Sequence, residues 1–321
     1  MRAALIDAPG GPEVLRYGEV PDPVPGPGDV LIEVEAIAVE GGDTLARAEA
    51  EPAHFPHIVG YQCGGTVIAV GQDVSSVAVG DRVVGVELDG SHAELRVVPE
   101  AFCWAVPGSL SVPEAACVPI AFATAHDCLF EFGRLQRGEV ALVHAGAGGV
   151  GVAAIQLAKR AGARVLATAS SAERLERLVA LGLDDGIDYT TADFAEEVRR
   201  LTDGHGADVV VDSVGTTLPG SLRCLAYRGR CVTVGDAGRH RGEPLDISTL
   251  RANNQTLAGY FLGAELFTGT RARQLVTDLL DEVAQGTLRV VIDQSFPLSE
   301  AAAAHAYIES RRAFGRVLLV P

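Results

Sequence analysis

The sequence predicts an α/β fold in which a β-rich segment precedes a parallel sheet covered by helices. Alternating apolar residues between glycine and proline turns fill the first third of the 321 residues. From about Phe122, short apolar strands alternate with helical stretches, which is the pattern of a parallel sheet. The chain is long enough for two separate cores, and its 48% hydrophobic content is typical of a folded protein.

The β-rich segment is recognised by its alternation of apolar and polar residues. Residues 29–39 alternate in this way and follow a proline-rich loop at 21–28, which predicts a half-buried strand. Further strands are expected at 64–70, 82–86 and 93–98.

The second part is expected to alternate strands with helices. Its predicted strands lie at 140–143, 164–169, 186–189, 209–212 and 230–234. The segment 256–262 follows, and then come a helix at 271–285, a strand near Arg289, a helix at 299–311 and a final strand at 316–320.

A glycine-rich turn joins the first strand of this second part to its first helix. Gly146, Gly148 and Gly151 have the G-x-G-x-x-G spacing, between the apolar run 140–143 and a helical stretch at about 150–160. In dinucleotide-binding folds these glycines permit a tight turn, the approach of backbone to a pyrophosphate and close packing of helix on strand. The spacing therefore predicts a dinucleotide site; the alternative is an ordinary glycine-rich turn.

Composition argues against several other classes of function. The formal net charge of −16 disfavours a nucleic-acid partner, because phosphate backbones bind basic surfaces. No apolar run approaches the roughly 18 residues that cross a bilayer. The N-terminus turns polar too early for a secretion signal, so a cytoplasmic location is expected. The six cysteines form no C-x-x-C pair and are expected to be mostly buried thiols.

Several segments, in this order and spacing, resemble one protein family along essentially the whole chain. They are 8–15, Gly42-Asp43-Thr44, 60–65, 80–83, Thr124-Ala125, the glycine loop, 212–215 and 315–319. The chain resembles the zinc-independent quinone oxidoreductase (zeta-crystallin-like) branch of the medium-chain dehydrogenase/reductase superfamily.

The resemblance implies a domain organisation. A GroES-like substrate domain is expected over 1–121 and 264–321, and a Rossmann doubly wound parallel-sheet domain over 122–263. It also implies a cleft between the domains and a homodimer formed through an edge strand, here within 255–263.

The second strand indicates which dinucleotide is bound. NAD-binding folds usually place an acidic residue about 20 positions after the first glycine. Here the strand ends with Ser170 and Ser171, and Arg174 follows on the next helix. Small hydroxyls and a guanidinium suit the 2′-phosphate of NADPH, which we therefore expect as the cofactor. In the alternative interpretation, Arg174 only pairs with a neighbouring glutamate.

The resemblance extends this cofactor site to other positions. Tyr189 and Arg311 match positions that contact the adenosine phosphate end in relatives, and Thr124 is a plausible hydroxyl partner. The residues predicted to bind the cofactor are Thr124, Gly146, Ala147, Gly148, Gly149, Val150, Gly151, Ser170, Ser171, Arg174, Tyr189, Val214, Gly235 and Arg311.

No metal site is predicted. Zinc-dependent relatives carry a Gly-His-Glu segment, and the corresponding residues here are Gly60, Tyr61 and Gln62. Zinc needs about four converging ligands, which the sequence does not supply. His54 and His57 flank Pro56 and are expected to face solvent or to pack on the strand.

Without a Lewis acid, conjugate reduction is favoured over reduction of a simple carbonyl, because negative charge spreads into an enolate or hydroquinone oxygen. The expected acceptor is a small molecule, a quinone or an α,β-unsaturated carbonyl compound. Relatives commonly read Val-Asn-x-x-Asp-x-Tyr-x-Arg where this chain has residues 39–47. Glu40 replaces the asparagine near the nicotinamide, and Leu45 replaces the tyrosine proposed as a hydrogen-bond donor.

The candidate catalytic residues are Glu40, Asp43, Gln62 and His126. Glu40 either exchanges a proton, binds the nicotinamide amide or caps backbone. The four-residue spacing of Asp43 and Arg47 favours a helical ion pair over a catalytic dyad. Gln62 is expected to hydrogen-bond backbone. His126 is expected to be packed or backbone-bonded, with contact to substrate or nicotinamide as the alternative.

Two other functions remain open. Loss of the asparagine and the tyrosine is compatible with a low-turnover protein that binds or senses NADPH. Gly41 and Gly42 leave room for an elaborate unsaturated substrate, as a biosynthetic tailoring enoyl reductase would require.

Overall fold

The structure is a computed structural model that describes residues 1–321 except 50, 53, 240–244 and 246. The chain divides into two compact units. Unit 1 comprises Met1–Ile120 and Gly263–Pro321, and unit 2 comprises Ala121–Leu262. Unit 1 is β-rich and unit 2 is built on a parallel sheet, which confirms the predicted fold class. No helix in the described part of the chain is both long enough and apolar enough to span a membrane.

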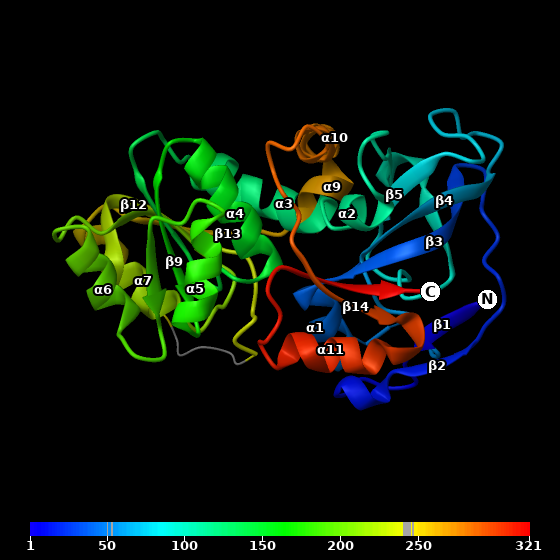
Figure 1. Ribbon diagram of the computed structural model, residues 1–321, viewed down its shortest axis with the longest axis horizontal. Helices are drawn as coiled ribbons and strands as arrows, with labels where there is room; N and C mark the ends of the chain where they lie inside the picture. The colour runs from blue at the N-terminus through cyan, green and yellow to red at the C-terminus, as the bar shows by residue number, and fades with distance from the viewer. Residues whose placement is uncertain (50, 53, 240–244, 246) are drawn as a thin grey trace. The chain divides into compact units, whose positions relative to one another are not determined.

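Unit 1 is built around a mainly antiparallel sheet that includes the last strand of the chain (Figure 1). Its strand order is β14-β15-β3-β4-β5-β7, and β6 also pairs with β3. The strands are β3 (Asp29–Val39), β4 (Gln62–Val70), β5 (Arg82–Val86), β6 (Leu95–Pro99), β7 (Cys103–Ala105), β14 (Ile292–Pro297) and β15 (Arg316–Val320). A separate antiparallel pair joins β1 (Arg2–Leu5) and β2 (Arg16–Glu19).

The larger core of unit 1 lies on one face of this sheet, and a smaller buried cluster that includes Ala36, Ala38 and Leu318 lies on the other. Ile32, Ile37, Val67 and Leu319 are fully buried in the larger core, because apolar residues alternate along each strand. The helix α11 (Ala301–Glu309) packs on β14 and β15 and contributes Ala301 and Ala304 to the same core. The other helices of the unit are α1 (Gly41–Glu49), α2 (Val112–Ala116), α9 (Leu262–Thr268) and α10 (Arg271–Ala284).

The strand predicted near Arg289 is present, but it begins at Ile292. The chain runs without regular structure through Arg289, and β14 begins only at Ile292, where its parallel register with β15 starts opposite Arg316.

Unit 2 contains a wholly parallel sheet with the order β10-β9-β8-β11-β12-β13. The order reverses between β8 and β11, so this is the doubly wound arrangement with its switch point between those two strands. The strands are β8 (Val140–Val143), β9 (Arg164–Ala169), β10 (Asp185–Asp188), β11 (Ala207–Asp212), β12 (Leu225–Thr233) and β13 (Thr256–Gly259).

Helices cover both faces of the sheet in unit 2. One face packs on α4 and α5: Gly146 lies close to Ile155 and Leu178, and Gly186 lies against Leu175. The opposite face, which includes Leu142 and Val210, packs on α6 and α7. The helices are α4 (Gly149–Arg160), α5 (Ala172–Val179), α6 (Phe194–Leu201) and α7 (Leu218–Cys224). The helix α3 (Pro119–His126) precedes the sheet and continues into a π-helical turn, Asp127–Phe132.

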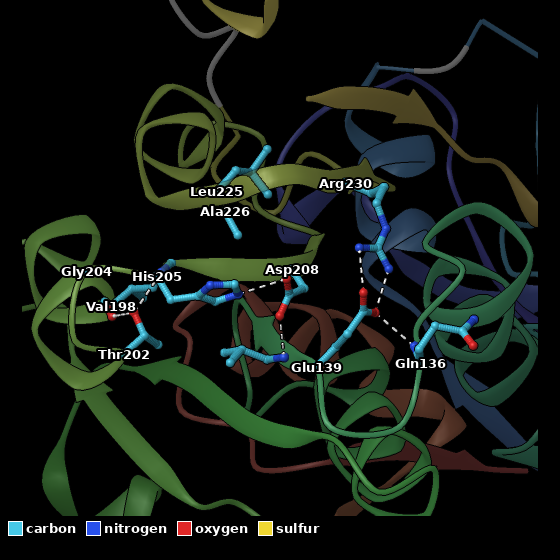
Figure 2. Close-up of polar contacts among 12 residues, drawn as sticks. Gln136, Glu139, Val198, Thr202, Gly204, His205, Asp208, Leu225, Ala226 and Arg230 are labelled. Atoms are coloured by element: carbon cyan, nitrogen blue, oxygen red, sulfur yellow. Dashed lines mark hydrogen bonds and ion pairs between the residues drawn. The ribbon is translucent and has the colours of Figure 1, made fainter. Parts of the chain in front are cut away.

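Polar side chains tie together the amino ends of the central strands of unit 2 (Figure 2). Glu139 accepts two hydrogen bonds from Arg230, at 3.0 and 2.6 Å, and one from the backbone N–H of Gln136 at 2.8 Å. Asp208 accepts from the Val140 backbone N–H at 2.8 Å and lies 3.0 Å from the His205 ring. These ties join β8, β11 and β12 at the edge opposite the glycine loop.

Replacing Glu139 by glutamine tests the contribution of this ion pair. Burial alone would raise the pKa of Glu139, but Arg230 and the Gln136 N–H outweigh burial and hold it below its usual value. At pH 7 we expect Glu139→Gln to lower the free energy of unfolding by about 1–3 kcal/mol. The stabilisation is present above the pKa of the unfolded chain and is lost as pH falls through the lower folded value. The deficit should therefore shrink below about pH 4.

Urea unfolding followed by circular dichroism between pH 3 and 8 measures this effect. Glu176→Gln, on an exposed position of α5, is the matched control. A deficit that does not change with pH would show that the charge of Glu139 contributes nothing.

Candidate active site

The glycine loop of unit 2 forms a tight turn between β8 and α4. A Cβ atom on Gly151 would lie 2.4 Å from the Ala145 carbonyl oxygen, and one on Gly146 would lie 2.8 Å from the Ala167 Cβ. Both glycines are therefore required by close approach of helix and strand. Gly148 is the N-cap of α4, and the first turn of this helix carries no acidic side chain. The N–H groups of that turn have no intrahelical acceptor and can bind an anion, so the loop fits a dinucleotide pyrophosphate.

Most of the residues predicted to bind a 2′-phosphate lie at the carboxyl ends of β9 and β10. Ser170 and Ser171 follow β9, and Tyr189, which is 41% exposed, follows the adjacent strand β10. The Ser171 hydroxyl caps α5 by accepting the Arg174 N–H at 3.4 Å, and this cap fixes the first turn on which the Arg174 side chain stands. No carboxylate stands at the tip of β9.

Two further predicted cofactor residues lie at the same edge of the sheet. Val214 follows β11, and its N–H donates to the Asp212 carboxylate at 3.0 Å. Gly235 follows β12, where a Cβ atom would lie 3.1 Å from the Ser213 carbonyl oxygen. Thr124 is buried on α3 of unit 2, whereas Arg311 belongs to unit 1 and follows α11 with a left-handed φ of 59°.

A buried hydrogen-bond network lies beneath this edge. Thr168 Oγ1 is 3.1 Å from His144 Nδ1, and His144 Nε2 is 2.9 Å from Ser221 Oγ. Ser221 donates to Asp212 at 3.0 Å, and Asp212 also accepts from Thr217 at 2.7 Å. Burial lowers the pKa of His144, so its ring is neutral. The network holds the ends of β8, β9 and β11 and the start of α7 in one arrangement.

In unit 1, Glu40 is buried in an ion pair with Arg316. Arg316 Nη1 donates to Glu40 Oε2 at 2.9 Å, and Arg316 Nη2 and Gln62 Nε2 both donate to Glu40 Oε1. Burial raises the pKa of Glu40, and the Arg316 guanidinium opposes that rise. Gln62 accepts a backbone hydrogen bond from Ile120 at 3.1 Å, as expected. Glu40 thus joins the end of β3 to the start of β15.

Asp43 is fully buried in the first turn of α1. Its carboxylate accepts the backbone N–H groups of Glu40 at 2.8 Å and of Tyr61 at 3.1 Å. Burial, together with the charge of Glu40, raises the pKa of Asp43 to about 8, although the two backbone hydrogen bonds favour its charged form.

The expected ion pair between Asp43 and Arg47 is wrong. Arg47 donates instead to Glu309 on α11 at 2.6 Å and to the Gly10 carbonyl at 3.0 Å. Asp43 faces the backbone amides at the start of α1, so the two side chains point to different neighbours despite their helical spacing.

His126 lies at the end of α3 in unit 2. Its Nδ1 is 3.2 Å from the buried Asp127 carboxylate, and its ring packs edge-on against Phe130 at 4.9 Å. Asp127 also accepts the Tyr260 hydroxyl at 2.8 Å. His126 is therefore a packed, carboxylate-oriented imidazole.

Two family models match the chain. One, described as an alcohol dehydrogenase GroES-like domain, covers residues 26–108; the other, described as a zinc-binding dehydrogenase, covers residues 149–319. A quinone oxidoreductase from Pseudomonas aeruginosa is 36% identical over 320 residues, covering 97% of each chain. A 2-haloacrylate reductase from a Burkholderia species is 34% identical over 99% of this chain and 98% of its own. The structure of Escherichia coli quinone oxidoreductase complexed with NADPH superposes with a TM-score of 0.95 at 28% identity, covering 100% of each chain.

The chain belongs to the quinone oxidoreductase (zeta-crystallin-like) branch of the medium-chain dehydrogenase/reductase superfamily. The family resemblance predicted from the sequence is confirmed.

The description of one family model raises the question of zinc. In this quinone oxidoreductase-like chain, no three His, Cys, Asp or Glu side chains of the described residues converge on a point where a metal ion could bind. Tyr61 and Gln62 replace the His and Glu of the Gly-His-Glu segment. The described residues therefore do not fit a zinc ion, which needs about four ligands.

The sequence did not identify Arg316 or the network of His144, Ser221 and Asp212. Arg316 begins an ordinary terminal strand, so no local pattern marks it as the partner of Glu40. The sequence offered only a weak indication of the network in unit 2: His144, Thr168 and Asp212 each stand at or near the carboxyl end of a predicted strand.

Removing the Ser221 hydroxyl tests the network of unit 2. Ser221→Ala removes one buried hydrogen-bond partner from His144 and one from Asp212, so we expect the free energy of unfolding to fall by about 1–3 kcal/mol. Thermal unfolding measures the loss, with Ser299→Ala at an exposed position as the control. An unchanged melting temperature would contradict a stabilising role.

Replacing Glu40 tests the ion pair of unit 1. Glu40→Gln leaves the Arg316 charge buried without its counter-charge, and we expect a loss of about 3–5 kcal/mol. Glu33→Gln, on an exposed position of the same strand, should change stability by less than about 0.5 kcal/mol. Equal effects of the two substitutions in urea unfolding would contradict this assignment.

Proposed function

We propose that this protein is an oxidoreductase that uses NADPH to reduce a quinone or an α,β-unsaturated carbonyl compound. The observation that carries the proposal is the glycine loop at the carboxyl edge of the sheet in unit 2, beside a second strand that ends in serines and is followed by Arg174. Relatives named for quinone and 2-haloacrylate reduction, and a similar structure described as an NADPH complex, support it.

Several residues of this chain would hold the dinucleotide. The backbone of residues 146–151 would bind the pyrophosphate, because Gly146 and Gly151 let strand and helix approach closely. The N–H groups of the first turn of α4 have no intrahelical acceptor and can bind an anion. Ser170, Ser171, Arg174 and Tyr189 would face the 2′-phosphate, since a guanidinium binds phosphate oxygens through paired N–H groups.

NADPH supplies a hydride when bound. The described residues offer no ligand set for a catalytic metal ion. An acceptor whose conjugation spreads the charge that develops on its oxygen is therefore favoured. Quinones and α,β-unsaturated carbonyl compounds both have this property.

Glu40 acts in this proposal as a positioning residue. Both of its carboxylate oxygens are engaged by Arg316 and Gln62, so neither is left to exchange a proton with substrate. The pair holds the end of β3, from which the two glycines Gly41 and Gly42 begin α1.

We also propose a homodimer. The strand β13 lies at the edge of the sheet in unit 2, and an edge strand presents unpaired N–H and C=O groups to a second chain. Sedimentation equilibrium tests this proposal, and a monomer at micromolar concentration would contradict it.

The decisive experiment is stopped-flow measurement of NADPH oxidation with quinones, enones and enoyl thioesters. Turnover above the background rate with at least one class of acceptor is expected. Tight NADPH binding without turnover of any acceptor would instead indicate a protein that binds or senses the dinucleotide.

Replacing Arg174 tests the cofactor preference. We expect Arg174→Ala to weaken NADPH binding by about 1–3 kcal/mol, the range of a charged hydrogen bond, and to leave NADH binding nearly unchanged. Isothermal titration calorimetry measures both affinities. Arg177→Ala, at an exposed position of the same helix, is the control. An equal loss for NADPH and NADH would place Arg174 away from the 2′-phosphate.

A further inference from the structure

We infer that the Thr168 hydroxyl is a positioning group for the dinucleotide, because it holds Ala145 in the conformation that shapes the glycine loop. The inference rests on the proposed function and lies entirely within unit 2. Thr168 is 2% exposed on β9, the strand beside β8, and it lies outside the glycine motif of residues 146–151.

Ala145 adopts an unusual backbone conformation directly before the glycine motif. Its φ of 49° lies in the left-handed region, which residues with a Cβ atom rarely occupy. Its carbonyl oxygen accepts the Gly148 N–H at 2.8 Å, and a Cβ atom on Gly151 would lie 2.4 Å from the same oxygen. The turn from β8 into α4 therefore closes around the Ala145 carbonyl group.

Thr168 holds Ala145 in this conformation from the neighbouring strand. Its Oγ1 accepts the Ala145 N–H at 3.3 Å, and its backbone carbonyl accepts the Gly146 N–H at 2.9 Å. A residue in a rarely adopted conformation persists only where its surroundings over-determine that conformation. The carbonyl contact is independent of the side chain at position 168, so the hydroxyl is the contact that the sequence controls.

The buried network directs the lone pairs of the Thr168 oxygen toward the loop. Ser221 gives its hydrogen to the Asp212 carboxylate at 3.0 Å, so its oxygen accepts one from His144 Nε2 at 2.9 Å. Burial lowers the pKa of His144, and its neutral ring therefore leaves Nδ1 as an acceptor. This nitrogen takes the Thr168 hydroxyl hydrogen at 3.1 Å. The lone pairs of Oγ1 are then left to accept the Ala145 N–H.

This arrangement determines how the loop meets the pyrophosphate. Gly148 is the N-cap of α4, and the Ala145 carbonyl fixes the Gly148 N–H beside the first turn of that helix. If Ala145 relaxes to a negative φ, this hydrogen bond is lost and the amides of the helix start move away from the anion. NADPH and NADH carry the same pyrophosphate, so the Thr168 hydroxyl contributes equally to the binding of both.

Thr168→Val tests the inference, because it removes the hydroxyl at nearly constant volume. We expect Kd to rise by about 3- to 10-fold for both NADPH and NADH, which corresponds to the loss of one hydrogen bond. Thr168→Ser retains the hydroxyl and should bind both nucleotides more tightly than the valine variant. Isothermal titration calorimetry, well below the melting temperature of each variant, measures the affinities.

Thr202→Val is the matched control. The Thr202 hydroxyl is also buried in unit 2 and also accepts a backbone N–H, that of Gly206 at 2.8 Å, but it lies at the amino edge of the sheet (Figure 2). Both valine variants should melt at a lower temperature, whereas only Thr168→Val should lose affinity. An equal loss of affinity in the two variants would reduce Thr168 to a general stabilising residue and would overturn the inference.

Ala145→Gly supplies an independent variant, because glycine adopts a positive φ without steric cost. In an Ala145→Gly chain, the added Thr168→Val substitution should change Kd by less than about twofold. A loss as large as that in the parental chain would show that the hydroxyl does not act through the conformation of Ala145, which refutes the inference.

The outcomes separate this inference from the proposed function. If the parental protein binds NADPH and Thr168→Val binds it within about twofold, a smaller change than loss of one hydrogen bond, the role of Thr168 is refuted and the proposed function stands. A loss confined to NADPH would place the effect at the 2′-phosphate and would refute the role in the loop. If the parental protein binds neither nucleotide, the proposed function fails and the role of Thr168 fails with it.

Discussion

The buried pair of Glu40 and Arg316 is the interaction on which the arrangement of unit 1 depends. It joins the end of β3 to the start of β15, across 276 positions of sequence. Burying charges is costly unless their remaining hydrogen-bonding groups are satisfied. Gln62 satisfies Glu40 in this way, whereas Nε of Arg316 has no hydrogen-bond partner among the described residues. Because α1 begins directly after Glu40, the pair also determines where Gly42 and Asp43 lie.

Unit 2 also buries polar side chains away from water, but most of them are uncharged. Its loop must hold backbone amides toward an anion, and the residues beneath that loop must not shift. A neutral imidazole, three hydroxyls and one carboxylate satisfy one another there, and Asp212 in addition orders the turn after β11 by accepting from two backbone N–H groups. Satisfied buried networks of this kind favour one arrangement over its neighbours.

Local patterns predicted the parts of the fold that local chemistry determines. The glycine loop and the strands at 140–143 and 164–169 were visible because strand, turn and helix signals are contiguous. The partners of Glu40 and Arg47 were not visible, because Arg316 and Glu309 lie more than 250 residues away in sequence. The spacing of Asp43 and Arg47 suggested a helical pair, but backbone amides and α11 offered each side chain a better neighbour.

The ion pair of Glu139 with Arg230 and the contact of Asp208 with the Val140 N–H lie at the amino edge of the sheet in unit 2 (Figure 2). The glycine loop and the serines that follow β9 lie at its carboxyl edge. The amino edge thus carries stabilising contacts, whereas the carboxyl edge combines the residues proposed to bind the dinucleotide with the buried network of His144, Ser221 and Asp212. Substitutions at the carboxyl edge that alter dinucleotide preference, such as those of Ser170, Ser171 or Arg174, therefore leave the contacts of Glu139 and Arg230 at the amino edge in place.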